Sequence, residues 1–146
     1  MTTRILFVCL GNICRSPSAE AICRARIDGI ETDSAGTSGW HVGEPPYVPM
    51  IAAAAARGIE MGDLRARQFQ AADFDRFDLI IGMDESNLRN IEALRPAGNQ
   101  TPVRLMTEYV GSGETEVPDP YYTRDFDGCL DLLERCATGL ARDLSG

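Results

Sequence analysis

Lysine is missing from this sequence of 146 residues, and all 14 of its basic residues are arginine. A nucleotide-binding loop of the Gly-four-Gly-Lys type is therefore excluded, because its phosphate-binding lysine has no counterpart. Aspartate and glutamate together number 22, which gives a formal net charge of −8. Because this charge repels nucleic acids and anionic membrane surfaces, we predict that neither is a partner.

Long apolar runs are missing as well. No stretch approaches the ~20 apolar residues of a membrane-spanning helix, and no basic-then-apolar leader precedes the first apolar run. The five cysteines are an odd number without zinc-ligand spacing, which favours a reducing, cytoplasmic location and no metal site. The length and a hydrophobic content of 44% predict a single domain over residues 1–146, and we favour a monomer.

Strand and helix patterns alternate along the chain. Short apolar runs typical of buried strands lie at residues 5–8 and 79–81, a weaker strand is predicted at residues 31–34, and a last strand at residues 103–106. Helical patterns lie at residues 16–26, 49–57 and 85–94 and from Phe126 to Leu144. This alternation predicts a doubly wound α/β fold of three layers, in which helices cover both faces of a four-stranded parallel sheet. Ligands of such folds bind beyond the carboxyl ends of the strands.

A cysteine and an arginine bracket a loop at the end of the first predicted strand. Cys9 follows the apolar run, Arg15 comes six positions later, and Ser16-Pro17 opens a predicted helix. Gly11 and Asn12, within the loop, tolerate the left-handed backbone angles that a cradle of inward-pointing N–H groups requires. The loop therefore has the length and composition to close around one phosphate-sized anion. Its five inner residues are Leu10, Gly11, Asn12, Ile13 and Cys14.

The surroundings of Cys9 favour the thiolate, which is the nucleophilic form of cysteine. Loop N–H groups and a helix N-terminus supply partial positive charge, and Arg15 adds a full charge and a planar fork for two phosphate oxygens. Ser16 is expected either to cap the helix or to donate its hydroxyl to the sulfur. A buried structural cysteine is the alternative, but the preceding strand, Gly-Asn and Ser-Pro together favour an anion-binding nucleophile.

A second candidate catalytic group lies far along the chain. An ester oxygen leaves phosphorus readily only if a proton arrives with it, and a carboxylic acid on a nearby loop can supply that proton. Asp119 is the candidate, in the stretch Val117-Pro118-Asp119-Pro120-Tyr121-Tyr122. An Asp-Pro pair alone is typical of an ordinary turn. Its occurrence with the Cys9 loop and two following tyrosines favours a general acid.

The run CLGNICRSP at residues 9–17 resembles the active-site loop of the low-molecular-weight protein tyrosine phosphatases. Further matches follow in order at residues 33–37 (DSAGT), 83–87 (MDESN) and 119–122 (DPYY), so the resemblance spans nearly the whole chain. It implies a Rossmann-like, phosphotyrosine phosphatase I-like fold. It also implies an enzyme that hydrolyses phosphotyrosine and aryl phosphate monoesters without a metal or other cofactor.

The resemblance implies a role for each residue of the loop. Cys9 would attack phosphorus and form a phosphocysteine, while Asp119 would protonate the leaving phenolate and then activate a water. Arg15 would hold phosphate oxygens. The rest of the phosphate-binding loop would be Leu10, Gly11, Asn12, Ile13, Cys14 and Ser16. The family also shows oxidation of the nucleophile to a disulfide with the neighbouring cysteine, which makes Cys14 the expected redox partner.

Other residues are expected around this loop. The family places an aromatic side chain at the rim of the substrate cleft, which here is Trp40, and Tyr121 would form the opposite wall. The asparagine of the loop is commonly held by a serine and a histidine, and Ser34 matches the serine. Leu64 stands where the histidine is expected, which leaves open how the loop is kept rigid.

Two more residues are open to different interpretations. His41 is the only histidine, and because the sequence offers it no partner we expect it on a surface loop. Asp84 follows Met83 at the end of a predicted strand, where it either caps the next helix or supports the site.

Three other functions remain as alternatives. Arginine phosphatases share the loop but typically have threonine where this chain has Ile13, which favours an aryl phosphate over phosphoarginine. Arsenate reductases of this type use two further cysteines in the middle of the chain, and this sequence has none between Cys23 and Cys129. A non-catalytic phosphotyrosine-binding module would keep Arg15 but lose Cys9 or Asp119, and both are present. The expected partner is therefore a phosphotyrosine-containing protein as substrate, with a tyrosine kinase among the candidates.

Overall fold

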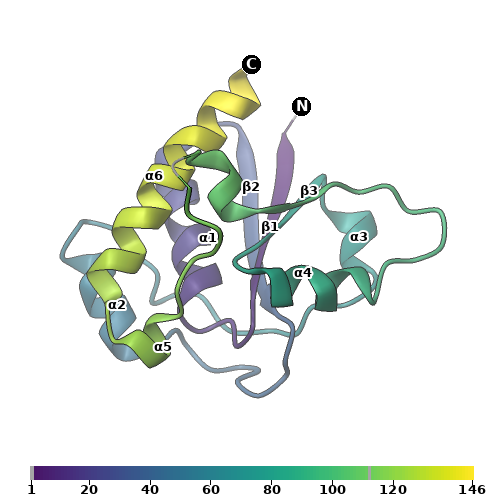
Figure 1. Ribbon diagram of the computed structural model, residues 1–146. Helices are drawn as coiled ribbons and strands as arrows, with labels where there is room; N and C mark the ends of the chain where they lie inside the picture. The colour runs from purple at the N-terminus through teal and green to yellow at the C-terminus, as the bar shows by residue number, and fades with distance from the viewer. Residues whose placement is uncertain (1, 112) are drawn as a thin grey trace.

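The fold, given by a computed structural model that describes residues 2–111 and 113–146, is built on one parallel sheet. Its strands lie in the order β2-β1-β3-β4 (Figure 1). All four predicted strands are present, and their bounds are β1 Thr3–Cys9, β2 Ile30–Gly36, β3 Leu79–Gly82 and β4 Val103–Leu105. The predicted doubly wound α/β class is confirmed.

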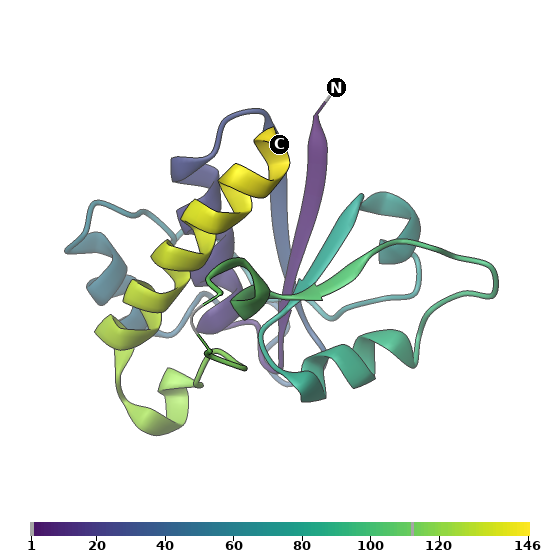
Figure 2. The ribbon, with the colours of Figure 1, turned by 45° about the horizontal axis from the view of Figure 1, so that its top comes forward.

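Helices cover both faces of the sheet. The helices α1 (Arg15–Arg26), α2 (Val48–Ala55) and α6 (Phe126–Ser145) lie on one side, and α3 (Asp73–Arg76) and α4 (Glu85–Glu92) lie on the other (Figure 1, Figure 2). The arrangement has the three layers that the sequence predicts. In the part of the chain that the structure describes, no helix has the length and apolar character needed to cross a membrane.

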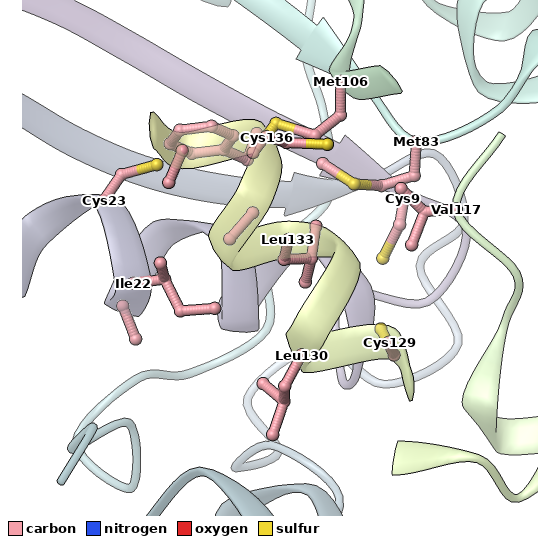
Figure 3. Close-up of a cluster of buried hydrophobic side chains, with 14 of the residues drawn as sticks. Cys9, Ile22, Cys23, Met83, Met106, Val117, Cys129, Leu130, Leu133 and Cys136 are labelled. Atoms are coloured by element: carbon pink, nitrogen blue, oxygen red, sulfur yellow. The ribbon is translucent and has the colours of Figure 1, made fainter. Parts of the chain in front are cut away.

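The central strand β1 places its side chains alternately in two cores, as the period of two along a strand requires. Ile5 and Phe7 belong to the larger core, which also contains side chains of α1 and α6, whereas Leu6 and Val8 belong to the smaller core on the opposite face. All four are fully buried. Cys9 continues the first series and lies in the larger core at the carboxyl end of the strand (Figure 3).

Several short elements differ from the sequence prediction. Met106 ends the predicted fourth strand, but in the structure it opens the 3₁₀ helix η1 (Met106–Tyr109). The one-turn helices α3 and α5 (Pro120–Thr123) were not predicted either. One turn of helix is too short to produce a periodic apolar pattern, and the capping contacts that hold it are decided locally.

Gly36, the last residue of β2, brings the sheet into direct contact with the loop that follows β1. A methyl group added here would lie 2.8 Å from the carbonyl oxygen of Leu10 and 3.1 Å from the carbonyl carbon of Gly11. Both neighbours are backbone atoms, so the loop itself would have to move.

We therefore expect Gly36→Ala to lower the free energy of unfolding by about 1–3 kcal/mol, the usual cost of overpacking. Urea denaturation measures this change. Gly62→Ala is the matched control, because a methyl group at Gly62 meets no atom within 4 Å. Equal unfolding midpoints for the two variants would contradict the close approach.

Candidate active site

The loop between β1 and α1 folds back over the sulfur of Cys9. Asn12 adopts the left-handed conformation, with φ 57°, and its backbone N–H donates to Cys9 Sγ at 3.3 Å. Ser16 Oγ lies 3.0 Å from the same sulfur. Of the two roles expected for Ser16, the structure shows the contact with sulfur, since α1 has no side-chain cap and begins at Arg15.

The side chain of Asn12 holds the loop in this shape. Its Nδ2 donates to Ser16 Oγ and to Ser34 Oγ, both at 2.9 Å, and its Oδ1 accepts from the backbone N–H of Arg67 at 3.0 Å. Ser34 therefore lies where the sequence places it. Leu64 packs half-buried against the larger core and takes no part in this network. The backbone of Arg67 fills the acceptor of Asn12, so the loop is held without a histidine side chain.

Arg15 is a buried cation that two carboxylates and a carbonyl oxygen surround. Its Nη1 donates to Asp84 Oδ2 at 2.7 Å and to the carbonyl oxygen of Val117 at 3.1 Å, and its Nη2 lies 3.5 Å from Asp119 Oδ2. The residue is 4% exposed. Burial opposes its charge, but Cys9, Asp84 and Asp119 outweigh burial and raise the pKa of Arg15 above its ordinary value. The guanidinium is thus charged and fixed in place.

Asp84 performs both of the roles that the sequence left open. Its Oδ1 accepts from the backbone N–H of Asn87 at 2.7 Å and caps α4, while its Oδ2 binds Arg15. One carboxylate therefore joins the start of a helix on one face of the sheet to the cation of the loop.

Asp119 lies on the same pocket as Cys9, although 110 positions separate the two in the sequence. Its Oδ1 accepts from the backbone N–H of Tyr121 at 3.1 Å and caps α5. Its side chain is 24% exposed, so the carboxylate is accessible to a ligand in the pocket.

Aromatic side chains form the rim of this pocket. Trp40 and Tyr121, the two predicted walls, both line it and are 71% and 41% exposed. The ring of Tyr121 packs against Tyr47, with 5.2 Å between centroids, and against Tyr122, with 5.3 Å. Ile13 and Cys14 line the pocket from the loop. The arrangement suits a flat aryl group attached to an anion.

Tyr122, the second tyrosine after Asp119, also lines the pocket. Sequence reasoning missed two residues at or beside the rim, and His41, which lines the pocket, is the first of them. His41 has a partner after all, because its Nδ1 lies 2.9 Å from Glu44 Oε2, and the spacing of three residues was the available signal. Arg124 donates to the hydroxyl of Tyr47 at 3.0 Å, a contact across 77 positions that no local pattern announces.

The other cysteines are buried free thiols in the described structure. Burial, with smaller contributions from Asp119 and Cys9, raises the pKa of Cys14, so this thiol is protonated at neutral pH. Cys23, Cys129 and Cys136 lie in the larger core, as expected. Among residues 2–111 and 113–146, no group of three or more potential ligands is arranged to hold a metal ion.

This fold, with a cysteine, a buried arginine and an aspartate around one pocket at the carboxyl edge of the sheet, is that of a cysteine-dependent phosphatase. The sequence model described as low molecular weight phosphotyrosine protein phosphatase matches residues 4–146, and the chain belongs to this family.

Individual relatives agree over nearly the full length. A low molecular weight protein-tyrosine-phosphatase of Streptomyces coelicolor is 45% identical, over 96% of this chain and 92% of its own. The crystal structure of YfkJ from Bacillus subtilis has a TM-score of 0.94 at 37% identity, over 99% of this chain and 96% of that one. A Drosophila arginine phosphatase is also similar, with a TM-score of 0.90 at 28% identity, over 97% and 98% of the chains.

The contact between Asp84 and Arg15 allows a direct test. Asp84→Asn keeps an oxygen to cap α4 but replaces the charge-assisted bond to Arg15 with a neutral one. We expect kcat/KM for an aryl phosphate to fall about tenfold, which corresponds to about 1.4 kcal/mol. Steady-state kinetics measures this fall. The neighbouring Glu85→Gln should leave kcat/KM unchanged, and an equal fall in both variants would refute the role of the contact.

Proposed function

We propose that this protein is a protein tyrosine phosphatase that hydrolyses phosphotyrosine and other aryl phosphate monoesters. The observation that carries the proposal is the meeting of Cys9, Arg15 and Asp119 on one pocket with an aromatic rim. Family membership supports the same reaction.

In the first step Cys9 Sγ attacks phosphorus in line with the bond to the phenolic oxygen. As the sulfur–phosphorus bond forms, the phosphorus–oxygen bond breaks, and Asp119 gives its proton to the departing phenolate. Arg15 and the loop N–H groups hold the three equatorial oxygens, on which charge is spread in the transition state. The positive charge of the site thus comes from the chain itself, so the proposal includes no metal or other cofactor.

In the second step water hydrolyses the phosphocysteine. Asp119, now a carboxylate, takes a proton from the water as its oxygen attacks phosphorus, and the sulfur–phosphorus bond breaks. The hydroxyl of Ser16 and the N–H of Asn12 face the departing sulfur, at 3.0 and 3.3 Å in the free protein. Both can stabilise the thiolate that leaves.

The rim supports a preference for tyrosine. Trp40 and Tyr121 can pack on the two faces of a phenyl ring. A shorter phosphoserine would not bring its phosphate to Cys9 while keeping those contacts. Phosphoarginine is the second candidate, because one similar structure is that of an arginine phosphatase. Ile13 lines the pocket as an apolar side chain, which favours an aryl group over a guanidinium.

The proposal extends to the setting in which the enzyme acts. Phosphotyrosine-containing proteins are its substrates, with a tyrosine kinase among the candidates. It works as a single domain over residues 1–146, as a monomer and in the cytoplasm. Cys9 and Cys14 line the same pocket. Oxidised Cys9 would form a disulfide with Cys14, which protects the nucleophile from irreversible oxidation.

Two substitutions test the catalytic roles with p-nitrophenyl phosphate as substrate. Cys9→Ser should abolish turnover, and Asp119→Ala should lower kcat by about 10²–10⁴-fold, because the leaving group then departs without a proton from the enzyme. Glu116→Gln, an exposed carboxylate three residues before Asp119, is the control and should leave kcat unchanged. Turnover in the Cys9→Ser variant, or an unchanged kcat in Asp119→Ala, would remove that residue from the mechanism.

Trp40 is expected to determine substrate preference. Loss of ring packing in Trp40→Ala should lower kcat/KM for a phosphotyrosine peptide about 3–10-fold, as expected for an aromatic contact of about 0.5–1.5 kcal/mol. Initial rates on phosphotyrosine and phosphoarginine peptides measure both the fall and the preference. Val42→Ala, which shortens another exposed apolar side chain of the same loop, is the control. A wild-type enzyme that prefers phosphoarginine would overturn the tyrosine assignment.

A further inference from the structure

Glu20 is a buried carboxyl group that the proposed chemistry does not use. It lies on α1, is 6% exposed and does not line the pocket. Its Oε1 accepts a hydrogen bond from Ser34 Oγ at 2.7 Å. Ser34 in turn contacts Asn12, so Glu20 stands at the end of a hydrogen-bond chain that leads to Cys9.

The direction of every bond in this chain follows from the groups at its middle. Asn12 Oδ1 accepts from the backbone N–H of Arg67, so the amide nitrogen of Asn12 must give its two hydrogens to Ser34 and Ser16. Both serine oxygens are therefore acceptors toward Asn12, and each serine retains one hydrogen of its own.

Glu20 provides the acceptor for the hydrogen of Ser34. The remaining hydrogen, on Ser16, has Cys9 Sγ at 3.0 Å and the carbonyl oxygen of Ala35 at 3.4 Å as acceptors. The shorter contact is to the sulfur. The chain from Glu20 thus ends on a hydroxyl that donates to the nucleophile, and all five side chains involved are at most 6% exposed.

We propose that Glu20 is a positioning residue for the nucleophile, because it takes the hydrogen of Ser34 and so leaves the oxygen of Ser34 free to accept from Asn12, which in turn holds Ser16 beside Cys9. This inference rests on the proposed role of Cys9. Glu20 touches neither the substrate nor the reacting atoms, and it acts only through the three side chains between it and the sulfur.

The charge state of Glu20 determines how strongly it holds this orientation. Burial raises the pKa of Glu20 to about 7, and the hydrogen bond from Ser34 lowers it by a smaller amount. Of the charged groups that face it, Asp33 on β2 and Asp63 raise the pKa and Arg24 on α1 lowers it. Above about pH 7 the carboxylate only accepts, so it fixes the hydrogen of Ser34. Below this pH the protonated group can itself donate to Ser34, whose own hydrogen is then no longer held.

Two variants separate the acceptor from the charge. Glu20→Met removes the acceptor at similar volume, and we expect kcat for p-nitrophenyl phosphate to fall about tenfold with KM unchanged, because Arg15 and the loop N–H groups remain. Glu20→Gln keeps an acceptor oxygen but does not titrate. It should retain kcat at pH 8 within about twofold. In the wild type we expect the rate of Cys9 alkylation by iodoacetamide to change as Glu20 loses its proton near pH 7, and this change should be absent in Glu20→Gln.

Thermal unfolding checks the raised pKa of Glu20 independently of catalysis. In the wild type the folded state keeps a proton on Glu20 up to about pH 7, while the unfolded chain loses it near the ordinary glutamate pKa of 4.5. Wild-type stability therefore falls as pH rises between these values. Glu20→Gln lacks this loss, so its gain in Tm over the wild type should be larger at pH 8 than at pH 5.

Glu31→Gln, which neutralises an exposed carboxylate on β2, is the control and should match the wild type in kcat and in alkylation profile. Inorganic phosphate should slow the alkylation of a cysteine in the pocket, so the part of the reaction that phosphate slows is assigned to Cys9. Unchanged kcat in Glu20→Met, or a wild-type alkylation profile in Glu20→Gln, would overturn the proposal. Loss of turnover in Cys9→Ser is measured separately, so the proposed function can stand when the role of Glu20 fails.

Discussion

The buried charge of Arg15 is the constraint on which the site depends. A guanidinium that is 4% exposed must be surrounded by anions and acceptors, since an unpaired charge in that position would cost several kcal/mol. Its partners come from the end of β3, where Asp84 lies, and from the segment that carries Val117 and Asp119. Three parts of the chain are thereby brought together around the position that a phosphate would occupy.

Backbone hydrogen bonds connect the segment that carries Val117 and Asp119 to the sheet. The backbone N–H of Val117 donates to the carbonyl oxygen of Met83 at 2.9 Å, and that of Met83 donates to Val8 at 3.1 Å. The segment that carries Asp119 is therefore anchored to two neighbouring strands at their carboxyl ends. A general acid on a loop gains from such anchoring, because proton transfer needs a defined distance to the leaving oxygen.

The nucleophile loop depends on one amide side chain. Asn12 makes three hydrogen bonds with partners from α1, β2 and the backbone of Arg67, and its own backbone N–H faces the sulfur. A residue with φ 57° is strained unless its surroundings hold it, and these bonds do so. Leu64 takes no part in these bonds, because the backbone N–H of Arg67 fills the acceptor of Asn12. Glu20, at the far end of the network, accepts from Ser34 and extends this hydrogen-bond chain into the buried part of α1.

The local sequence by itself determined the strand, loop and helix around Cys9, because apolar alternation, loop length and the Ser-Pro start of a helix all act between near neighbours. It also located Arg15, Asp119, Trp40 and Tyr121 as site candidates, through the motifs that they share with a family. Only the tertiary structure decided that Asp84 both caps α4 and binds Arg15 across 69 positions, that the backbone N–H of Arg67 donates to Asn12, and that His41 lines the pocket. These contacts join residues far apart in the chain, and their geometry depends on how the sheet and its helices pack rather than on any pattern within one segment.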